Sequence, residues 1–223
     1  MKYFEITQET DSKIIGRYPQ VKELKIPFKE ARASQWGKID EWKSDEDIPD
    51  LNNFLLQTKS KFTDLISNSF IIVSDGIFIS ERCKEIFEKF KVNGNFYNAT
   101  IHKLDEKLSY CFLKYEYGGL SNIIWEKSEF IEYNINTLEF GNIVLVKNFK
   151  DYKEKVDSLR ISKNDDMALW NLFPKLIRIN KKYDMTPMFK YGLICNEKVK
   201  NAIEENKLTG FLFKELDVDI VFE

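Results

Sequence analysis

Two segments of this chain resemble each other, and this resemblance restricts the folds open to it. Residues 76–97 read GIFISERCKEIFEKFKVNGNFY, residues 192–213 read GLICNEKVKNAIEENKLTGFLF, and the two align without a gap. The identical positions are Gly76/Gly192, Glu81/Glu197, Lys84/Lys200, Glu88/Glu204, Lys91/Lys207 and Gly94/Gly210. A repeat of this length indicates one supersecondary unit that is used twice.

Each segment predicts a helix between two strands. Ser80 and Asn196 are residue types that cap helix N-termini, and each precedes a glutamate that the helix dipole favours. Apolar residues then recur with helical spacing, and Gly94 and Gly210 follow where a left-handed residue commonly ends a helix. The shared glutamates and lysines fit solvated helix positions better than a twofold binding site.

The rest of the chain predicts short strands and few helices. Pro19, Pro27 and Pro49 interrupt any long element in the first third of the chain. We expect strands at residues 2–6, 70–73, 96–102, 108–115, 143–146, 176–179 and 214–222, and helices within residues 52–65 and 149–159. Residues 123–133 are ambiguous between helix and strand. The predicted class is α+β, with mixed or antiparallel sheets, a few short helices and the duplicated strand–helix–Gly turn–strand unit.

No stretch is rich enough in Pro, Gly or Ser to form a clear linker. We therefore expect one compact unit with three parts. Residues 1–70 form an irregular N-terminal region, residues 71–160 the lobe with the first repeat, and residues 161–223 the C-terminal lobe with the second.

The charge balance and the apolar patterning narrow the classes of function. The chain has 34 basic and 36 acidic residues, a net charge of −2, which is not the basic excess typical of a nucleic-acid binder. The N-terminus lacks the apolar core of a signal peptide, and no apolar run approaches membrane-spanning length. We expect a cytoplasmic protein that binds neither nucleic acid nor membrane, with Cys83, Cys111 and Cys195 as small core residues.

The sequence carries little that indicates catalysis. Its one histidine, His102, lies in a predicted strand, where a surface or hydrogen-bonded structural role is commoner than a catalytic one. It contains no nucleophile elbow, phosphate-binding loop, dinucleotide fingerprint or zinc-protease motif. We therefore expect no enzyme activity, no cofactor and no metal.

Acidic residues gather in two places that are candidate partner contacts. The first is Asp40, Glu41, Asp45, Glu46, Asp47 and Asp50, accompanied by Trp36 and Trp42. Such a surface attracts a basic partner, and tryptophan is enriched at interface hot spots, although an acidic solvated loop with its tryptophans in the core is the plainer alternative. The second is the outer face of the predicted strand at residues 214–222, with Glu215, Asp217 and Asp219.

Residues 70–220 resemble the immunity proteins of bacterial polymorphic toxin systems, in particular the family first described for a myxobacterial immunity protein. The matching features are the ISERCKEIFEKF segment, the C-terminal LICNEKVKNAIEENKLTGFLFKEL segment and the turn at Leu208, Thr209 and Gly210. Cys195 and Asn196 stand where that family prefers a Val-Ser pair. The resemblance implies a non-catalytic protein that binds and neutralises a cognate toxin, such as a nuclease encoded next to it, with the acidic residues above as candidate contacts.

Two other functions stay open on the sequence alone. One is a small-ligand-binding or scaffold protein with a pocket between its two lobes. The other is a hydrolase whose site assembles from dispersed carboxylates.

Overall fold

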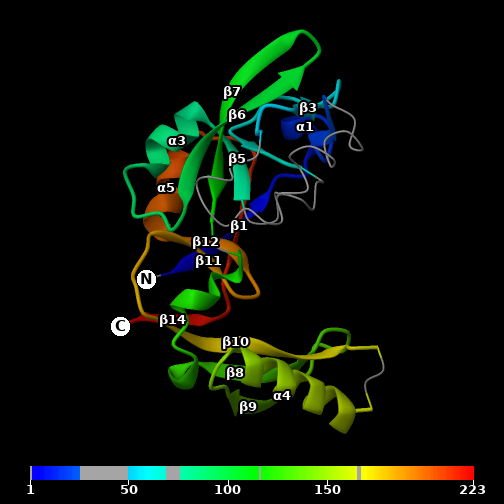
Figure 1. Cartoon of the computed structure of the whole chain (residues 1–223), viewed down its shortest axis with the longest axis vertical. Helices are drawn as coiled ribbons and strands as arrows, with labels where there is room; N and C mark the ends of the chain where they lie inside the picture. Colours follow the sequence, from blue (N-terminus) through cyan, green and yellow to red (C-terminus); the bar gives the residue numbers. More distant parts are fainter. Residues whose placement is uncertain (1, 26–49, 69–75, 116, 165–166) are drawn as a thin grey trace.

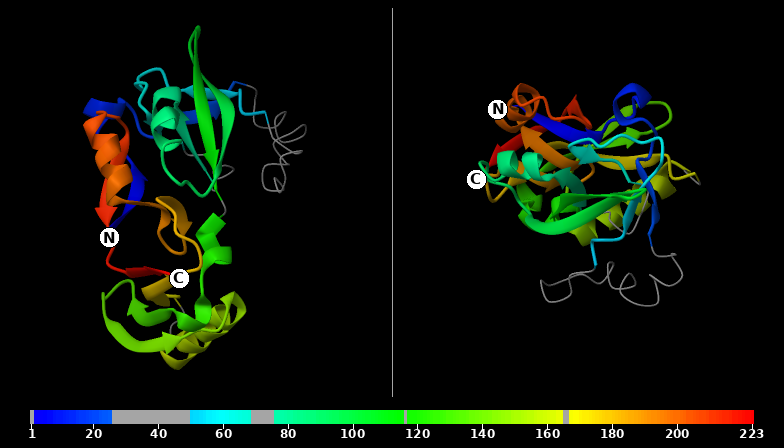
Figure 2. Two further views of the ribbon diagram at one scale, coloured as in Figure 1. Left: turned by 90° about the vertical axis from the view of Figure 1, so that its left-hand side faces the viewer. Right: turned by 90° about the horizontal axis from the view of Figure 1, so that it is seen from above.

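A computed structural model describes residues 2–25, 50–68, 76–115, 117–164 and 167–223. The fold is α+β, with three sheets stacked along the long axis of the molecule and a few short helices (Figures 1 and 2). We call them the six-stranded sheet, the central sheet and the distal sheet. The expected class, α+β with mixed or antiparallel sheets and a few short helices, is confirmed.

The six-stranded sheet has the order β2-β3-β6-β7-β5-β4, in which only the β3–β6 pair is parallel. The central sheet has the order β11-β12-β1-β13 and is antiparallel throughout. The strands of the six-stranded sheet are β2 (Val21–Leu24), β3 (Phe54–Leu56), β4 (Leu65–Ile66), β5 (Gly76–Ser80), β6 (Asn95–Lys103) and β7 (Glu106–Lys114). Those of the central sheet are β1 (Tyr3–Gln8), β11 (Met185–Met188), β12 (Gly192–Asn196) and β13 (Phe211–Glu215).

The two similar segments fold into the same order of elements. The first forms β5, helix α3 (Glu81–Phe87) and β6, and the second forms β12, helix α5 (Glu197–Glu205) and β13. In each case the two strands are not neighbours, because a third strand lies between them and runs antiparallel to both. That third strand is β7 in the six-stranded sheet and β1 in the central sheet. That the two segments are one duplicated unit stays a prediction.

Two aspartates hold the segments together in a reciprocal way. Asp64 accepts hydrogen bonds from Ser80 Oγ (2.7 Å), which caps α3, and from the backbone N–H of Thr209 (2.8 Å), which follows α5. Asp184 accepts from Asn196 Nδ2 (2.6 Å), at the cap of α5, and from the backbone N–H of Lys91 (2.9 Å), which follows α3. Each aspartate therefore ties the start of one helix to the chain beyond the end of the other.

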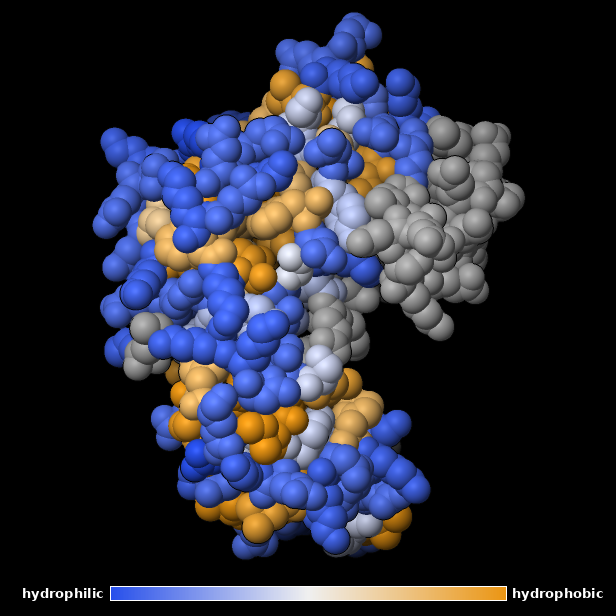
Figure 3. All heavy atoms as spheres, turned by 60° about the vertical axis from the view of Figure 1, so that its left-hand side comes forward, coloured by the Kyte–Doolittle hydropathy of each residue, from blue (hydrophilic) through white to orange (hydrophobic). Residues whose placement is uncertain are grey.

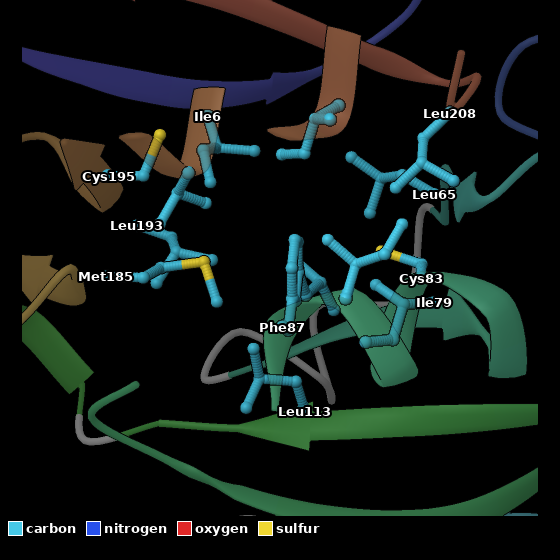
Figure 4. Close-up of a cluster of buried hydrophobic side chains, with 14 of the residues drawn as sticks. Ile6, Leu65, Ile79, Cys83, Phe87, Leu113, Met185, Leu193, Cys195 and Leu208 are labelled. Carbon is cyan, nitrogen blue, oxygen red and sulfur yellow. The ribbon is translucent and has the colours of Figure 1, made fainter. Parts of the chain in front are cut away.

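A shared apolar core fills the space between these two sheets and their helices (Figure 4). Phe87 of α3 is fully buried there, as is Val199 of α5. Cys83, Cys111 and Cys195 belong to the same core and form no disulfide, which confirms that they are small core residues. The core thus joins residues from both segments into one body.

The distal sheet has the order β14-β10-β8-β9 and is covered on one side by helix α4 (Phe149–Ser162). Phe130 and Leu172 pack toward Tyr152 and Val156 of that helix. Its strands are β8 (Glu129–Asn134), β9 (Phe140–Leu145), β10 (Trp170–Ile179) and β14 (Asp219–Phe222), and only β10 and β14 pair in parallel. The remaining helical elements of the described residues are α1 (Ser12–Ile15), η4 (Tyr117–Asn122) and η5 (Trp125–Lys127).

Several sequence-based predictions need correction. Residues 52–65 form no helix; β3 occupies part of this range, because Phe54 and Leu56 are buried in the six-stranded sheet. Residues 214–222 are not one strand, since β13 ends at Glu215 in the central sheet and β14 begins at Asp219 in the distal sheet. Gly210 has the expected positive φ of 92°, but Gly94 does not have a positive φ.

Other predictions agree with the structure in kind and differ in their ends. The expected antiparallel pair at residues 96–102 and 108–115 is β6 and β7, and the helix expected at residues 149–159 is α4. The ambiguous residues 123–133 contain η5 and most of β8. The strand expected at residues 70–73 lies outside the described residues. Within the described residues, no helix has the length and apolar character that crossing a membrane requires.

Candidate functional site

Among the described residues, the predicted partner contacts do not come together. The following lie outside the described residues: Trp36, Asp40, Glu41, Trp42, Asp45, Glu46 and Asp47. Asp50 precedes β3 in the six-stranded sheet, at the opposite end of the molecule from the distal sheet (Figure 1). Its carboxylate accepts hydrogen bonds from the side chains of Asn52 and Asn53.

The three C-terminal acids have different surroundings. Glu215 forms an ion pair with Lys2 (2.7 Å), and this carboxylate raises the pKa of Lys2 through a hydrogen bond and its charge. Asp217 accepts a hydrogen bond from the Tyr191 hydroxyl (3.0 Å). Asp219 begins β14 and is exposed. They therefore do not form the outer face of one strand, and only Asp217 lines a groove that the structure describes.

That groove, which we call the distal groove, has a volume of about 460 Å³. Its floor is aromatic: the Tyr133 ring lies 5.1 Å from the rings of both Phe140 and Phe173. Side chains alternate between the two faces of a strand, so these residues lie opposite Phe130 and Leu172, which pack on α4. The residues that line the groove are Ile131, Tyr133, Phe140, Phe173, Pro174, Lys175, Tyr191, Lys214 and Asp217.

Part of the lining of the groove is polar. Lys175, Lys214 and Asp217 are exposed there, and Tyr191 is half-buried beside them. Burial, and then the hydrogen bond to the Asp217 carboxylate, raise the pKa of Tyr191, so its hydroxyl stays a neutral donor at physiological pH. The groove thus combines an aromatic floor with charged groups of both signs.

The apolar surface continues from the groove along the edge of the sheet. The pairs Ile131–Ile143 and Glu129–Leu145 place Ile143 and Leu145 on the same side as the groove. Phe140 is 66% exposed, Leu145 63% and Ile143 50%. Figure 3 shows apolar residues exposed between polar ones in the lower part of the molecule, where the distal sheet lies. We define the open face as Ile131, Tyr133, Phe140, Ile143, Leu145 and Phe173.

Two of the four charged positions that the similar segments share form ion pairs within each segment. Lys84 and Glu88 form an ion pair on α3, with the Lys84 Nζ 3.8 Å from the carboxylate. Lys200 and Glu204 form the same pair on α5 at 2.7 Å. These pairs span one helical turn, which favours a solvated helix surface over a twofold binding site.

The remaining reactive residues do not converge. The His102 Nε2 atom lies 2.7 Å from the Asn52 carbonyl oxygen, a contact that links β6 to the residues before β3. Burial raises the pKa of the Cys111 thiol to about 11 and that of Cys195 to about 12. Across the described ranges, no three His, Cys, Asp or Glu side chains are grouped so that they can hold a metal ion.

Sequence reasoning missed the open face, although one signal for it was present. Phe140–Leu145 reads FGNIVL, a strand with apolar residues and no charge. A solvent-exposed strand normally carries charged residues, so this composition indicates a covered or interacting strand. The contributions of Tyr133 and Phe173 carried no such signal, because they depend on which strands become neighbours.

No protein-family model matches this sequence, and a comparison with curated proteins finds no similar one.

Proposed function

We propose that this chain is a non-catalytic immunity protein that binds and neutralises a cognate bacterial toxin through the open face of its distal sheet. The observation that carries the proposal is the exposure of Phe140, Ile143 and Leu145 on one continuous apolar face. Contiguous exposed apolar residues with a polar rim are typical of protein-interaction surfaces. The resemblance to immunity proteins spans residues 70–220, which include most of this sheet.

The chemistry of the face suits a protein partner. Tyr133, Phe140 and Phe173 offer large aromatic contact areas, which dominate the energetics of interfaces. Lys175, Lys214 and Asp217 add charges at the rim, where they orient a partner and speed its association. Neutralisation by occlusion needs this shape and charge complementarity and no catalytic group.

The test is co-expression with the protein encoded immediately next to this one, with growth and complex recovery as readouts. The parent protein restores growth and co-purifies with the toxin. The variants Phe173→Asp and Lys175→Glu weaken binding by at least about tenfold, or about 1.4 kcal/mol. Lys175 is exposed, so its variant keeps the parent's melting temperature. The matched control is Ile161→Asp, which places the same charge on a 78% exposed apolar residue at the end of α4 and leaves binding unchanged.

The two parts of the proposal fail separately. A neighbouring protein that is not toxic, or a toxin that this chain does not neutralise, overturns the immunity function. Neutralisation with full affinity in both face variants overturns the open face as the docking site and leaves the immunity function standing.

A small amphipathic ligand is the second candidate, and the distal groove favours it. Its volume of about 460 Å³ and its aromatic floor with a few polar lining groups are typical of ligand pockets. Leu145→Asp distinguishes the two functions, because Leu145 belongs to the open face and does not line the groove. A protein partner is weakened by this change, whereas a ligand held within the groove is not.

A further inference from the structure

The six edge strands that the structure describes differ in how they are protected from pairing with another chain. Natural edge strands carry charges or proline, or are very short. In the central sheet, β11 has Pro187 and β13 has Lys214; in the six-stranded sheet, β2 has Lys22 and β4 is two residues long. In the distal sheet, β14 begins with the exposed Asp219. Five of the six described edges thus have a recognisable device against pairing.

The sixth edge strand, β9, has none of these devices. Its sequence FGNIVL contains no charge and no proline, and it is six residues long. Gly141 and Asn142 are exposed, and among the described residues only β8 pairs with this strand. Two features stand against pairing. A bulge sets Gly141 and Asn142 against the single residue Glu132 of β8, and at the end of the strand Lys155 Nζ donates to the Leu145 carbonyl oxygen (2.6 Å). The same ammonium group also pairs with the Asp151 carboxylate (2.9 Å), so it keeps an ionic partner when it leaves this carbonyl oxygen.

The charges that flank β9 indicate what pairs with it. Glu139 precedes the strand and Lys147 lies just beyond it, and both are exposed. In a twofold antiparallel pairing about Ile143, the start of each strand meets the end of the other. Glu139 of each copy then lies beside Lys147 of its partner, one residue out of direct register because of the bulge at residues 141 and 142. The strand is therefore complementary in charge to a second copy of itself, as an isologous interface requires.

The apolar side chains fit the same arrangement. An antiparallel pairing centred on Ile143 brings the two Ile143 side chains together and places each Phe140 near Leu145 of the other copy. Directly opposed apolar side chains stabilise neighbouring antiparallel strands. We infer that a second copy of this chain pairs with the β9 edge, so that the two distal sheets form one continuous sheet across a dimer. This inference does not rest on the proposed function, and its test requires no toxin.

The test measures the mass of the purified protein by sedimentation over a range of concentrations at low salt. The parent shows a concentration-dependent monomer–dimer equilibrium. Glu139→Lys and Lys147→Glu each raise the dimer dissociation constant by at least about tenfold, because each places two like-charged pairs across the twofold axis. The double variant restores the dimer, since it recreates both pairs with the signs exchanged. The difference between single and double variants shrinks at 0.5 M salt, where screening is strong.

Two further variants separate pairing at the β9 edge from a general effect of net charge. Glu106→Lys, on an exposed residue at the start of β7, changes the net charge by the same amount as Glu139→Lys and leaves the dimer intact. Ile143→Lys places a charge at the centre of the edge and yields a monomer with the parent's circular dichroism. A parent that is monomeric at all concentrations overturns the inference. A dimer that tolerates Ile143→Lys, or single variants that the double variant does not rescue, overturns it as well.

Discussion

At the scale of single residues, Asp64 shows how a few contacts set the charge state of a group. Burial alone raises the pKa of a carboxyl group, but hydrogen bonds from the Thr209 backbone, Ser80 and Arg82 together hold the pKa of Asp64 below its ordinary value. Arg82 also contributes its positive charge at 3.0 Å. The carboxylate of Asp64 is therefore the form that the folded protein stabilises.

We predict that Asp64→Asn destabilises the protein by about 2 kcal/mol at pH 7, because the charged acceptor is lost. The pKa is lower in the folded chain than in the unfolded chain. The stabilisation is thus fully present above the unfolded value near 3.9 and is lost as the pH falls through the folded value. Urea unfolding of the parent and the variant at pH 7 and at pH 3 measures this difference.

The stability gap between parent and Asp64→Asn is expected to narrow at the lower pH. Asp157→Asn is the control, since Asp157 is an exposed carboxylate on α4. A gap that keeps its size at pH 3 contradicts the role assigned to the Asp64 charge.

At the scale of elements, the glycines of the two similar segments are required for different physical reasons: a left-handed backbone, a close backbone neighbour, or both. Gly210 has a φ of 92°, and a Cβ atom there would lie 2.2 Å from the Leu65 carbonyl oxygen. Gly94 lacks the positive φ, but its Cβ atom would lie 2.5 Å from the Lys114 carbonyl oxygen. Gly192 has a φ of 73° and open space around it. Gly192 thus shows backbone strain alone, Gly94 shows crowding alone, and Gly210 shows both.

We predict that alanine at these positions destabilises the protein to different extents. Gly192→Ala costs about 1 kcal/mol, from left-handed strain alone. Gly94→Ala costs about 2 kcal/mol, because β6 must move away from the Lys114 backbone. Gly210→Ala combines both effects and costs about 3 kcal/mol. Chemical denaturation of the three variants gives the order, and an equal loss in all three would contradict this separation.

At the scale of the whole molecule, one apolar core unites the two similar segments. Cys83 and Cys111 come from the first segment and its sheet, Cys195 comes from the second, and all three are fully buried in that core. Together with the reciprocal bonds of Asp64 and Asp184, this packing predicts that the segments open together.

We predict that a thiol reagent at pH 8 modifies the three cysteines in a single kinetic phase, at least about a hundredfold more slowly than in urea. Burial raises the pKa of each thiol and also blocks access to it, so reaction requires unfolding. Mass spectrometry of partly labelled protein checks the result. Labelling of Cys195 well before Cys83 would show that the segments open independently.

The candidate site was only partly predictable from the sequence. Asp217 was among the predicted contacts and does line the distal groove. It lies between β13 and β14, however, and not within the single strand that the sequence predicted for residues 214–222. Phe140 lies in a charge-free run that indicates interaction. Tyr133 and Phe173 lie on the same face as Phe140 only because β8 pairs with both β9 and β10. No local sequence pattern specifies this pairing.

By itself, the sequence determined the local units of this protein. Caps such as Ser80 and Asn196, helical apolar spacing and strand alternation act between residues close in the chain, so they fix strand–helix–strand segments independently of the rest. Only the tertiary structure decided which strand lies between the two strands of each segment. That strand is β7 for the first segment and β1, from the far end of the chain, for the second. The pairing of β1 with β12 and β13, and the bond between Asp64 and Thr209, depend on burying one common core, and that is a property of the whole chain.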